Sequence, residues 1–207
     1  MIHDLLLRWV VTGLFALGAI ECALPILTGR RPWTVVVSHS LHFLMAVGMA
    51  VMAWPWSTQS PSTGPAVFFL LAAAWFTAIG ITVARSPGSR LLYAYHVVMM
   101  LATAWMYADM NGSMLSGHLS AQPSVSMSGM HVAAMNGPAN GGAPPWFSVV
   151  NWLGAVIFAI AAAFWTGKYL IIARAHAIPH RRSMGNLAQA ALAAGMAVLF
   201  LAALFAI

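Results

Sequence analysis

Six long apolar runs, separated by short polar segments, set the main limit on how this chain of 207 residues can fold. They cover about residues 6–28, 34–54, 65–84, 90–110, 146–172 and 186–207. A helix needs roughly 20 apolar residues to cross the hydrocarbon layer of a bilayer, and each run has that length. Only 6% of the residues are charged, whereas about a quarter are charged in a soluble domain. We therefore predict an all-α, polytopic membrane bundle of six transmembrane helices, in a single domain of residues 1–207.

The positive charges of the connecting segments predict the direction of these helices. Eight of the nine Lys and Arg residues flank the segments after the first, third and fifth runs, and only Arg8 lies on the other side. By the positive-inside rule those segments face the cytoplasm and both termini face outward. The formal net charge of +6 then reports orientation, and gives no reason to expect nucleic-acid binding. A basic patch beside the last connection suits anionic lipid headgroups, and it comprises Arg174, Arg181 and Arg182.

Histidine and methionine recur at one spacing in the second and fourth runs. In SHSLHFLMAVGMAVMAW, offsets 0, 3, 7 and 10 hold His42, Met45, Met49 and Met52. In AYHVVMMLATAWM, the same offsets hold His96, Met99, Thr103 and Met106. Residues at these offsets share one face of a helix. Both runs also cross in the same direction after an Arg-bearing turn. We therefore predict a duplicated helical hairpin, formed by the first and second and by the third and fourth runs, with a site between the two copies.

Ionisable side chains inside the apolar runs lie at a common depth. His39, His42 and His96 are five to eight residues from the predicted cytoplasmic ends of their helices, and Glu21 reaches the same level. At ~1.5 Å per residue this depth is roughly 8–12 Å. Intramembrane ionisable groups normally face the bundle interior and have partners. We expect Glu21 and the three histidines to form one polar layer.

A methionine stripe can equally be core packing, and an intramembrane histidine can be a hydrogen-bonded helix contact. The residues of the predicted outer loop, 111–145, are harder to explain by packing, because a flexible, uncharged segment has no core to fill. This loop carries Met114, His118, Met127, Met130, His131 and Met135. Its composition adds weight to a ligand role for the stripes, and both interpretations stay open.

The motifs SHSLHFLMAVGMAVMAW and AYHVVMMLATAWM, set within six apolar runs, resemble an actinobacterial membrane family that is catalogued as a domain of unknown function. The resemblance covers the first four runs best. It implies a multi-pass protein of the bacterial plasma membrane, and it carries no established activity.

Thioether and imidazole groups together suit the soft ion Cu(I). The leading hypothesis is a membrane metal-handling protein: the loop methionines capture copper, the stripes hold or pass it, and the polar layer binds it more tightly. The candidate metal ligands are Glu21, His39, His42, Met45, Met49, Met52, His96, Met99 and Met106.

Two alternatives remain open. His42 and His96 lie at similar depth on parallel helices and could hold a b-type haem for electron transfer. The chain could also be a cofactor-free accessory subunit of a larger membrane complex or oligomer, with the nearly featureless fifth and sixth runs facing lipid or a partner. A catalytic Ser/His/Asp set, a phosphate-binding glycine loop and paired carboxylates all lack support, so the sequence favours no class of enzyme.

Overall fold

The computed structural model describes residues 4–28, 32–55, 63–120, 145–174 and 180–205. These residues form six helices and no strand: α1 (Leu5–Thr28), α2 (Trp33–Met52), α3 (Thr63–Thr82), α4 (Pro87–Ser120), α5 (Pro145–Arg174) and α6 (His180–Phe205). Every helix of this described part is long and apolar enough to cross a membrane. The predicted all-α fold class is confirmed, and the chain is a multi-pass membrane protein.

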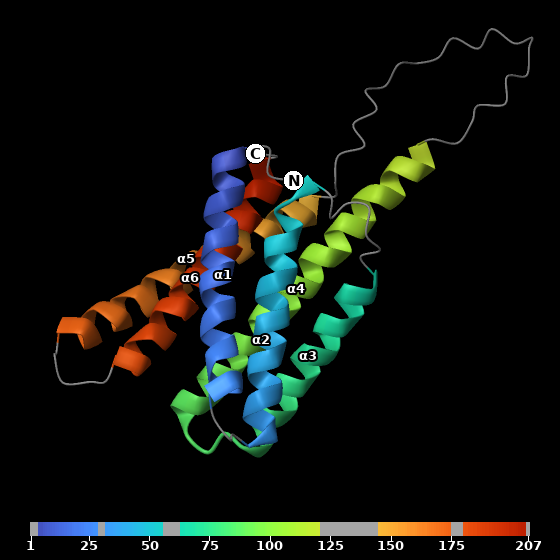
Figure 1. Cartoon of the computed structure of the whole chain (residues 1–207). Coiled ribbons are helices and arrows are strands. Elements are labelled where there is room, and N and C mark those ends of the chain that lie inside the picture. Colours follow the sequence, from blue (N-terminus) through green and yellow to red (C-terminus); the bar gives the residue numbers. More distant parts are fainter. Residues whose placement is uncertain (1–3, 29–31, 56–62, 121–144, 175–179, 206–207) are drawn as a thin grey trace, which may run out of the picture.

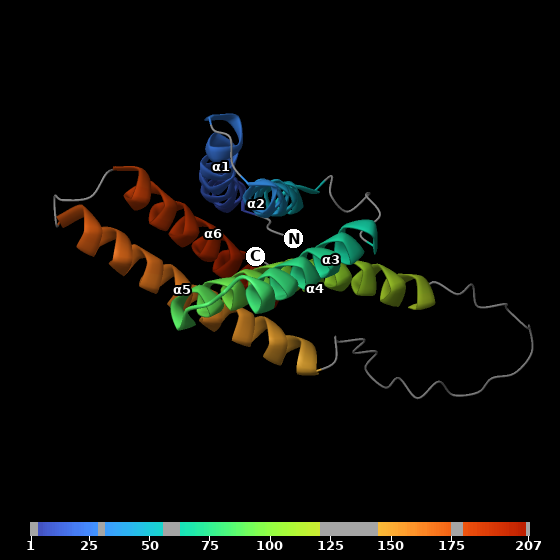
Figure 2. The same cartoon turned by 90° about the horizontal axis from the view of Figure 1, so that it is seen from below.

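The helices pack as antiparallel pairs, α1 with α2, α3 with α4 and α5 with α6 (Figures 1 and 2). The first two pairs are the hairpins expected from the repeated spacing, while their origin by duplication stays a prediction. Helix α1 also packs along α6. The start of α1 and the end of α6 lie at the same end of the bundle (Figure 1).

The fifth and sixth runs, which look alike in sequence, occupy different environments. In the most apolar part of α6, 61% of the residues are buried, against 17% in the most apolar part of α5. Helix α6 is therefore an interior helix that contributes to the core, whereas α5 presents most of its surface to the surroundings. The accessory-subunit alternative would place both runs against lipid or a partner, and the burial of α6 does not match that placement. Hydrophobicity alone does not tell an interior helix from a lipid-facing one.

Small residues set the close contact between α1 and α6. A Cβ on Gly18 would overlap Leu192, and one on Gly195 would lie 2.9 Å from the ring of Phe15. Phe15 and Leu192 are both completely buried, so each fills the space left by a glycine on the facing helix. Packing of this kind is a main source of helix association in a bilayer, where water does not drive apolar surfaces together.

Hydrogen bonds between side chains connect helices at several levels. The Trp54 indole N–H donates to Thr12 Oγ1 at 3.2 Å, which links the end of α2 to α1. The Trp105 indole N–H donates to Asn151 Oδ1 at 3.1 Å, which links α4 to α5. Asn151 is buried, so this bond satisfies an amide that would otherwise be costly inside the bundle.

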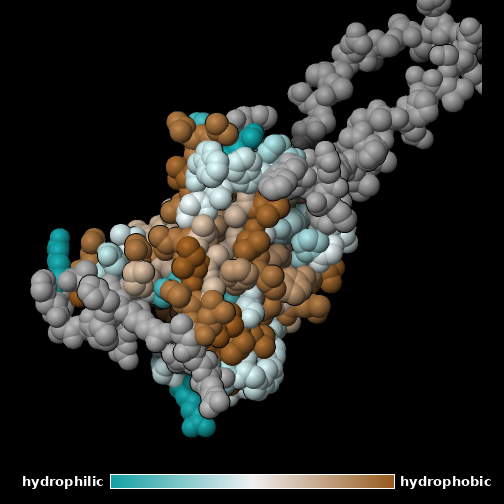
Figure 3. All heavy atoms as spheres, in the orientation of Figure 1, coloured by the Kyte–Doolittle hydropathy of each residue, from teal (hydrophilic) through white to brown (hydrophobic). Residues whose placement is uncertain are grey.

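The outer surface of the bundle is itself apolar. Leu27, Ile81 and Leu6 are among its most exposed side chains. In Figure 3 hydrophobic residues cover much of the visible face, and hydrophilic ones lie mostly toward its ends. Such a distribution is typical of a surface in contact with lipid.

Helix α4 is longer than the sequence indicated. The loop was expected to begin at residue 111, whereas the helix continues to Ser120. Its extension contains two glycines, which weaken a helix without ending it, and the first proline beyond it is Pro123. Met114 and His118 therefore lie on a helix and not in a loop.

Candidate functional site

The two histidines that begin the stripes meet between α2 and α4. His42 Nε2 and His96 Nδ1 are 3.0 Å apart, and their ring centroids are separated by 4.4 Å. Phe76 of α3 packs edge-on against His42, with ring centroids 5.0 Å apart. His42 is only 5% exposed. The backbones of α2 and α4 approach each other at few positions, so side chains such as this pair make the contact between the two helices.

Hydrogen-bond partners determine which nitrogen atoms of the pair carry protons. His42 Nδ1 is 2.8 Å from the carbonyl oxygen of Ser38. A carbonyl can only accept, so His42 donates through Nδ1–H, and in a neutral ring its Nε2 must be an acceptor. His96 then donates to it through Nδ1–H and keeps a lone pair on Nε2. Protons on both His42 nitrogens would instead bury a charge, which costs several kcal/mol.

His39 is held in the same way, one turn before His42. Its Nδ1 lies 2.9 Å from the carbonyl oxygen of Val35 and must donate to it. In a neutral His39 ring, Nε2 then keeps its lone pair.

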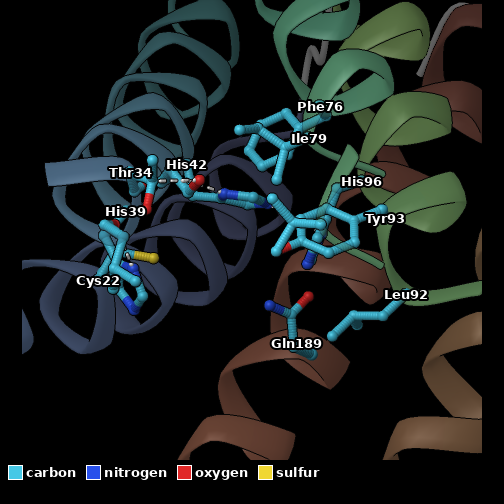
Figure 4. A pocket seen from close by; sticks show the side chains of 13 residues that line it. Cys22, Thr34, His39, His42, Phe76, Ile79, Leu92, Tyr93, His96 and Gln189 are labelled. Atoms are coloured by element: carbon cyan, nitrogen blue, oxygen red, sulfur yellow. Dashed lines mark hydrogen bonds between the residues drawn. The ribbon is translucent and has the colours of Figure 1, made fainter. Parts of the chain in front are cut away.

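All three histidines line one cavity of about 300 Å³ among α1, α2, α3, α4 and α6. Figure 4 shows His39 beside Cys22 on one side of it, His96 beside Tyr93 on another, and Gln189 entering from α6. The polar residues of its wall are Cys22, Thr34, Ser38, His39, His42, Tyr93, His96 and Gln189. Phe76 and Ile79 of α3, together with Val83 just after it, add apolar side chains to the wall.

Five of these polar wall residues were not predicted from the sequence, and they are Cys22, Thr34, Ser38, Tyr93 and Gln189. Gln189 carried a usable signal, because an amide inside an apolar run normally faces the bundle interior. Its Oε1 is buried and makes no hydrogen bond with the described residues. Cys22 and Tyr93 carried no comparable signal, since both residue types are common in lipid-facing and packed positions alike.

Glu21 was expected to join the histidines, but it is not part of the cavity wall. Its Oε1 lies 3.8 Å from the position that a Cβ would take on Gly185, at the start of α6. Consecutive residues of a helix point about 100° apart. The neighbouring Cys22 therefore faces the cavity, while Glu21 faces α6.

Both methionine stripes face the interior, as their offsets indicated. Met45, Met49 and Met99 are completely buried, and Met52 and Met106 nearly so. They belong to one apolar core together with Met100, Met196 and several phenylalanines. Thr103, which takes a stripe position in α4, donates its hydroxyl to the Met99 carbonyl at 2.9 Å. These surroundings suit core packing as well as thioether ligation.

A family model described as "Domain of unknown function (DUF5134)" matches residues 34–203. The chain belongs to the DUF5134 family. It is similar to the uncharacterized protein Rv0970 of Mycobacterium tuberculosis and the uncharacterized protein Mb0995 of Mycobacterium bovis, each 56% identical over 209 residues that cover 99% of both chains. These relatives confirm the actinobacterial family that the two motifs suggested. No solved structure matches the chain.

In this DUF5134 protein, the histidine pair as it stands leaves no room for an ion between its rings. Metal–nitrogen bonds of about 2 Å would separate two ligating nitrogens by roughly 3.3–4 Å, whereas His42 Nε2 and His96 Nδ1 are 3.0 Å apart. A haem iron bound by both rings would need them to separate further, to admit the macrocycle. Within the described segments, no group of three or more His, Cys, Asp or Glu side chains could hold a metal ion.

The remaining predicted residues of the DUF5134 chain lie toward helix ends or beyond them. Arg174 is the exposed last residue of α5. The side chains of Arg181 and Arg182, in the first turn of α6, and of Met114 and His118 on α4 are outside the described structure. The other four loop candidates also lie outside the described residues, and they are Met127, Met130, His131 and Met135.

Proposed function

We propose that this DUF5134 protein binds Cu(I) inside the membrane, through imidazole nitrogens of the cavity and thioether sulfurs of the buried methionines. The observation that supports it most is the continuity of soft donors along two helices. His42, Met45, Met49 and Met52 follow one another along the interior face of α2, and α4 presents the matching series to the same core.

The chemistry of these donors favours a soft ion. Thioethers bind Cu(I) well and hard cations such as Mg²⁺ or Ca²⁺ poorly. Among the described residues, the cavity wall has no carboxylate, and its donors are nitrogen and sulfur together with hydroxyl and amide groups. A hard cation would find few of its preferred ligands there.

The length of the stripe suits storage or passage across part of the membrane. Met52 lies ten residues beyond His42, or about 15 Å along a helix. This distance is half of a hydrocarbon layer of about 30 Å. A copper ion held in the cavity would therefore have further donors over roughly half of the bilayer.

We also propose that the protein lies in the bacterial plasma membrane with both termini outside, because eight of its nine Lys and Arg residues flank the opposite ends of the helices. The cavity would then open near the cytoplasmic side. A reporter that is active only in the cytoplasm should give no signal when it is fused to the C-terminus, and a strong signal there would reverse the orientation.

Copper binding can be tested by competition with a chromophoric Cu(I) chelator in detergent. Replacing Met45, Met49 and Met99 by Leu conserves volume and polarity, so the variant should fold. Its affinity should fall by more than the roughly 10-fold loss typical of removing an outer-shell partner. Met184→Leu is the matched control, because Met184 is exposed and its replacement should leave the affinity unchanged.

Two results would reject the proposal. If the wild-type protein never competes with the chelator, copper is not its ligand. If the triple variant equals the wild type, the methionines are packing residues. Elemental analysis and an absorption spectrum of the same sample test the haem alternative, for which a Soret band is the expected sign.

A further inference from the structure

The three histidines of the cavity have six ring nitrogens, and the hydrogen bonds of the structure use four of them. His42 uses both, donating to Ser38 and accepting from His96. His96 and His39 each use Nδ1 alone. The two nitrogens that remain as acceptors are Nε2 of His96 and Nε2 of His39, and both residues line the cavity.

This arrangement is the one that metal-binding histidines show. A histidine ligand almost always donates its other ring N–H to a fixed acceptor, which sets its tautomer and the direction of its lone pair. His96 has such an acceptor in His42 Nε2, and His39 has one in the Val35 carbonyl. His42 has no nitrogen left for an ion.

We infer that His96 presents its Nε2 to the ion as the imidazole donor of the cavity, and that His42 is a positioning residue. His42 holds His96 in the Nδ1–H tautomer by accepting that proton. This inference rests on the proposed function and changes the role of His42, which the sequence had suggested as a ligand.

Replacing His42 by amide side chains of two different lengths distinguishes a positioning role from a ligand role. In His42→Gln the side-chain carbonyl reaches the region of the former Nε2 and can accept from His96 Nδ1–H. In His42→Asn the amide is one carbon shorter, so it stays near the former Nδ1 and cannot reach His96. Neither amide is an imidazole ligand.

The Cu(I) affinity should therefore stay within about threefold of wild type in His42→Gln and fall about 10- to 100-fold in His42→Asn and His42→Leu, as for other outer-shell partners. His96→Leu should reduce it further, because the donor itself is lost. If His42→Gln weakens binding as much as His42→Leu, His42 is a ligand and the inference is overturned.

A second measurement needs no copper. Nitrogen-15 NMR of histidine-labelled protein reports the tautomer of each neutral ring, and the signal missing in His96→Leu identifies His96. In the wild type His96 should be the Nδ1–H tautomer, and in His42→Leu a large share should convert to Nε2–H. An Nε2–H tautomer in the wild type, or no change in His42→Leu, overturns the positioning role.

The two measurements can reject the proposed function and the positioning role independently. A wild-type protein that binds no Cu(I) rejects the proposed function and the ligand role of His96, whatever its tautomer. A protein that binds Cu(I) but lacks the expected tautomer keeps the proposed function and loses the positioning role of His42.

Discussion

The interface between α2 and α4 has two halves that are built from the same helical faces in different ways. In the cavity half, His42 and His96 meet by a hydrogen bond beside an open space of about 300 Å³. In the methionine half, Met45, Met49 and Met99 are completely buried in a continuous apolar core. In the cavity half, hydrogen bonds determine how the side chains are oriented. In the methionine half, side-chain volume determines how they pack.

The two halves differ in how clearly their structure indicates a function. A polar atom of a buried imidazole is costly without a partner. The hydrogen bonds that are made therefore define the tautomer of each ring, and they show which nitrogens remain available to a ligand. A thioether is a weak acceptor that needs no partner and fills irregular space well. Burial alone therefore cannot separate a methionine ligand from a packing methionine, and substitutions must do so.

Truncation in the methionine half should have the largest effect on stability. Met49→Ala removes most of a completely buried side chain, and we expect about 2–5 kcal/mol of lost unfolding free energy. Met49→Leu, which keeps the volume, should cost less than about 1.5 kcal/mol. Reversible unfolding of the purified protein in mixed micelles measures both.

The matched truncation in the cavity half is Ile79→Ala, since Ile79 lines the cavity and is only partly buried. Ile79→Ala should lower the free energy of unfolding clearly less than Met49→Ala does, because it enlarges an existing cavity and removes fewer contacts. Equal losses at the two positions would mean that the halves do not differ in packing.

The histidine pair should give the next largest effect. His96→Leu leaves Nε2 of the buried His42 without its donor, which should cost about 1–3 kcal/mol. His42→Leu should cost a similar amount. Because each single change already breaks the shared bond, the double variant should lose less than the sum of the two, with a coupling of about 0.5–3 kcal/mol. Additive losses in this cycle would show that the pair contributes no direct interaction.

The sequence was sufficient for the helices and for the inward direction of both stripes, because apolar length and helical periodicity are local properties. It also predicted that His42 and His96 face each other, since two polar groups at equal depth avoid lipid in this way. It could not place Glu21 or Cys22, because a rotation of α1 by about 100° exchanges which of them faces the cavity. Nor could it show that α6 is interior and supplies Gln189, which depends on how the helix pairs dock.

The smallest effect is expected at the second polar contact between the two helices. In the methionine half the Tyr107 hydroxyl donates to the Gly48 carbonyl at 3.2 Å, and the ring of Tyr107 stacks on Phe69 with centroids 5.8 Å apart. Tyr107→Phe keeps this stacking and removes only the hydrogen bond. Single hydrogen bonds between membrane helices contribute about 0.6 kcal/mol on average, and the Gly48 carbonyl keeps its other acceptor position for the helix. The loss should therefore be well below that of His96→Leu, and Cu(I) affinity should not change. A loss for Tyr107→Phe as large as that for His96→Leu would mean that hydrogen bonding organises both halves of the interface, and the contrast between them would not hold.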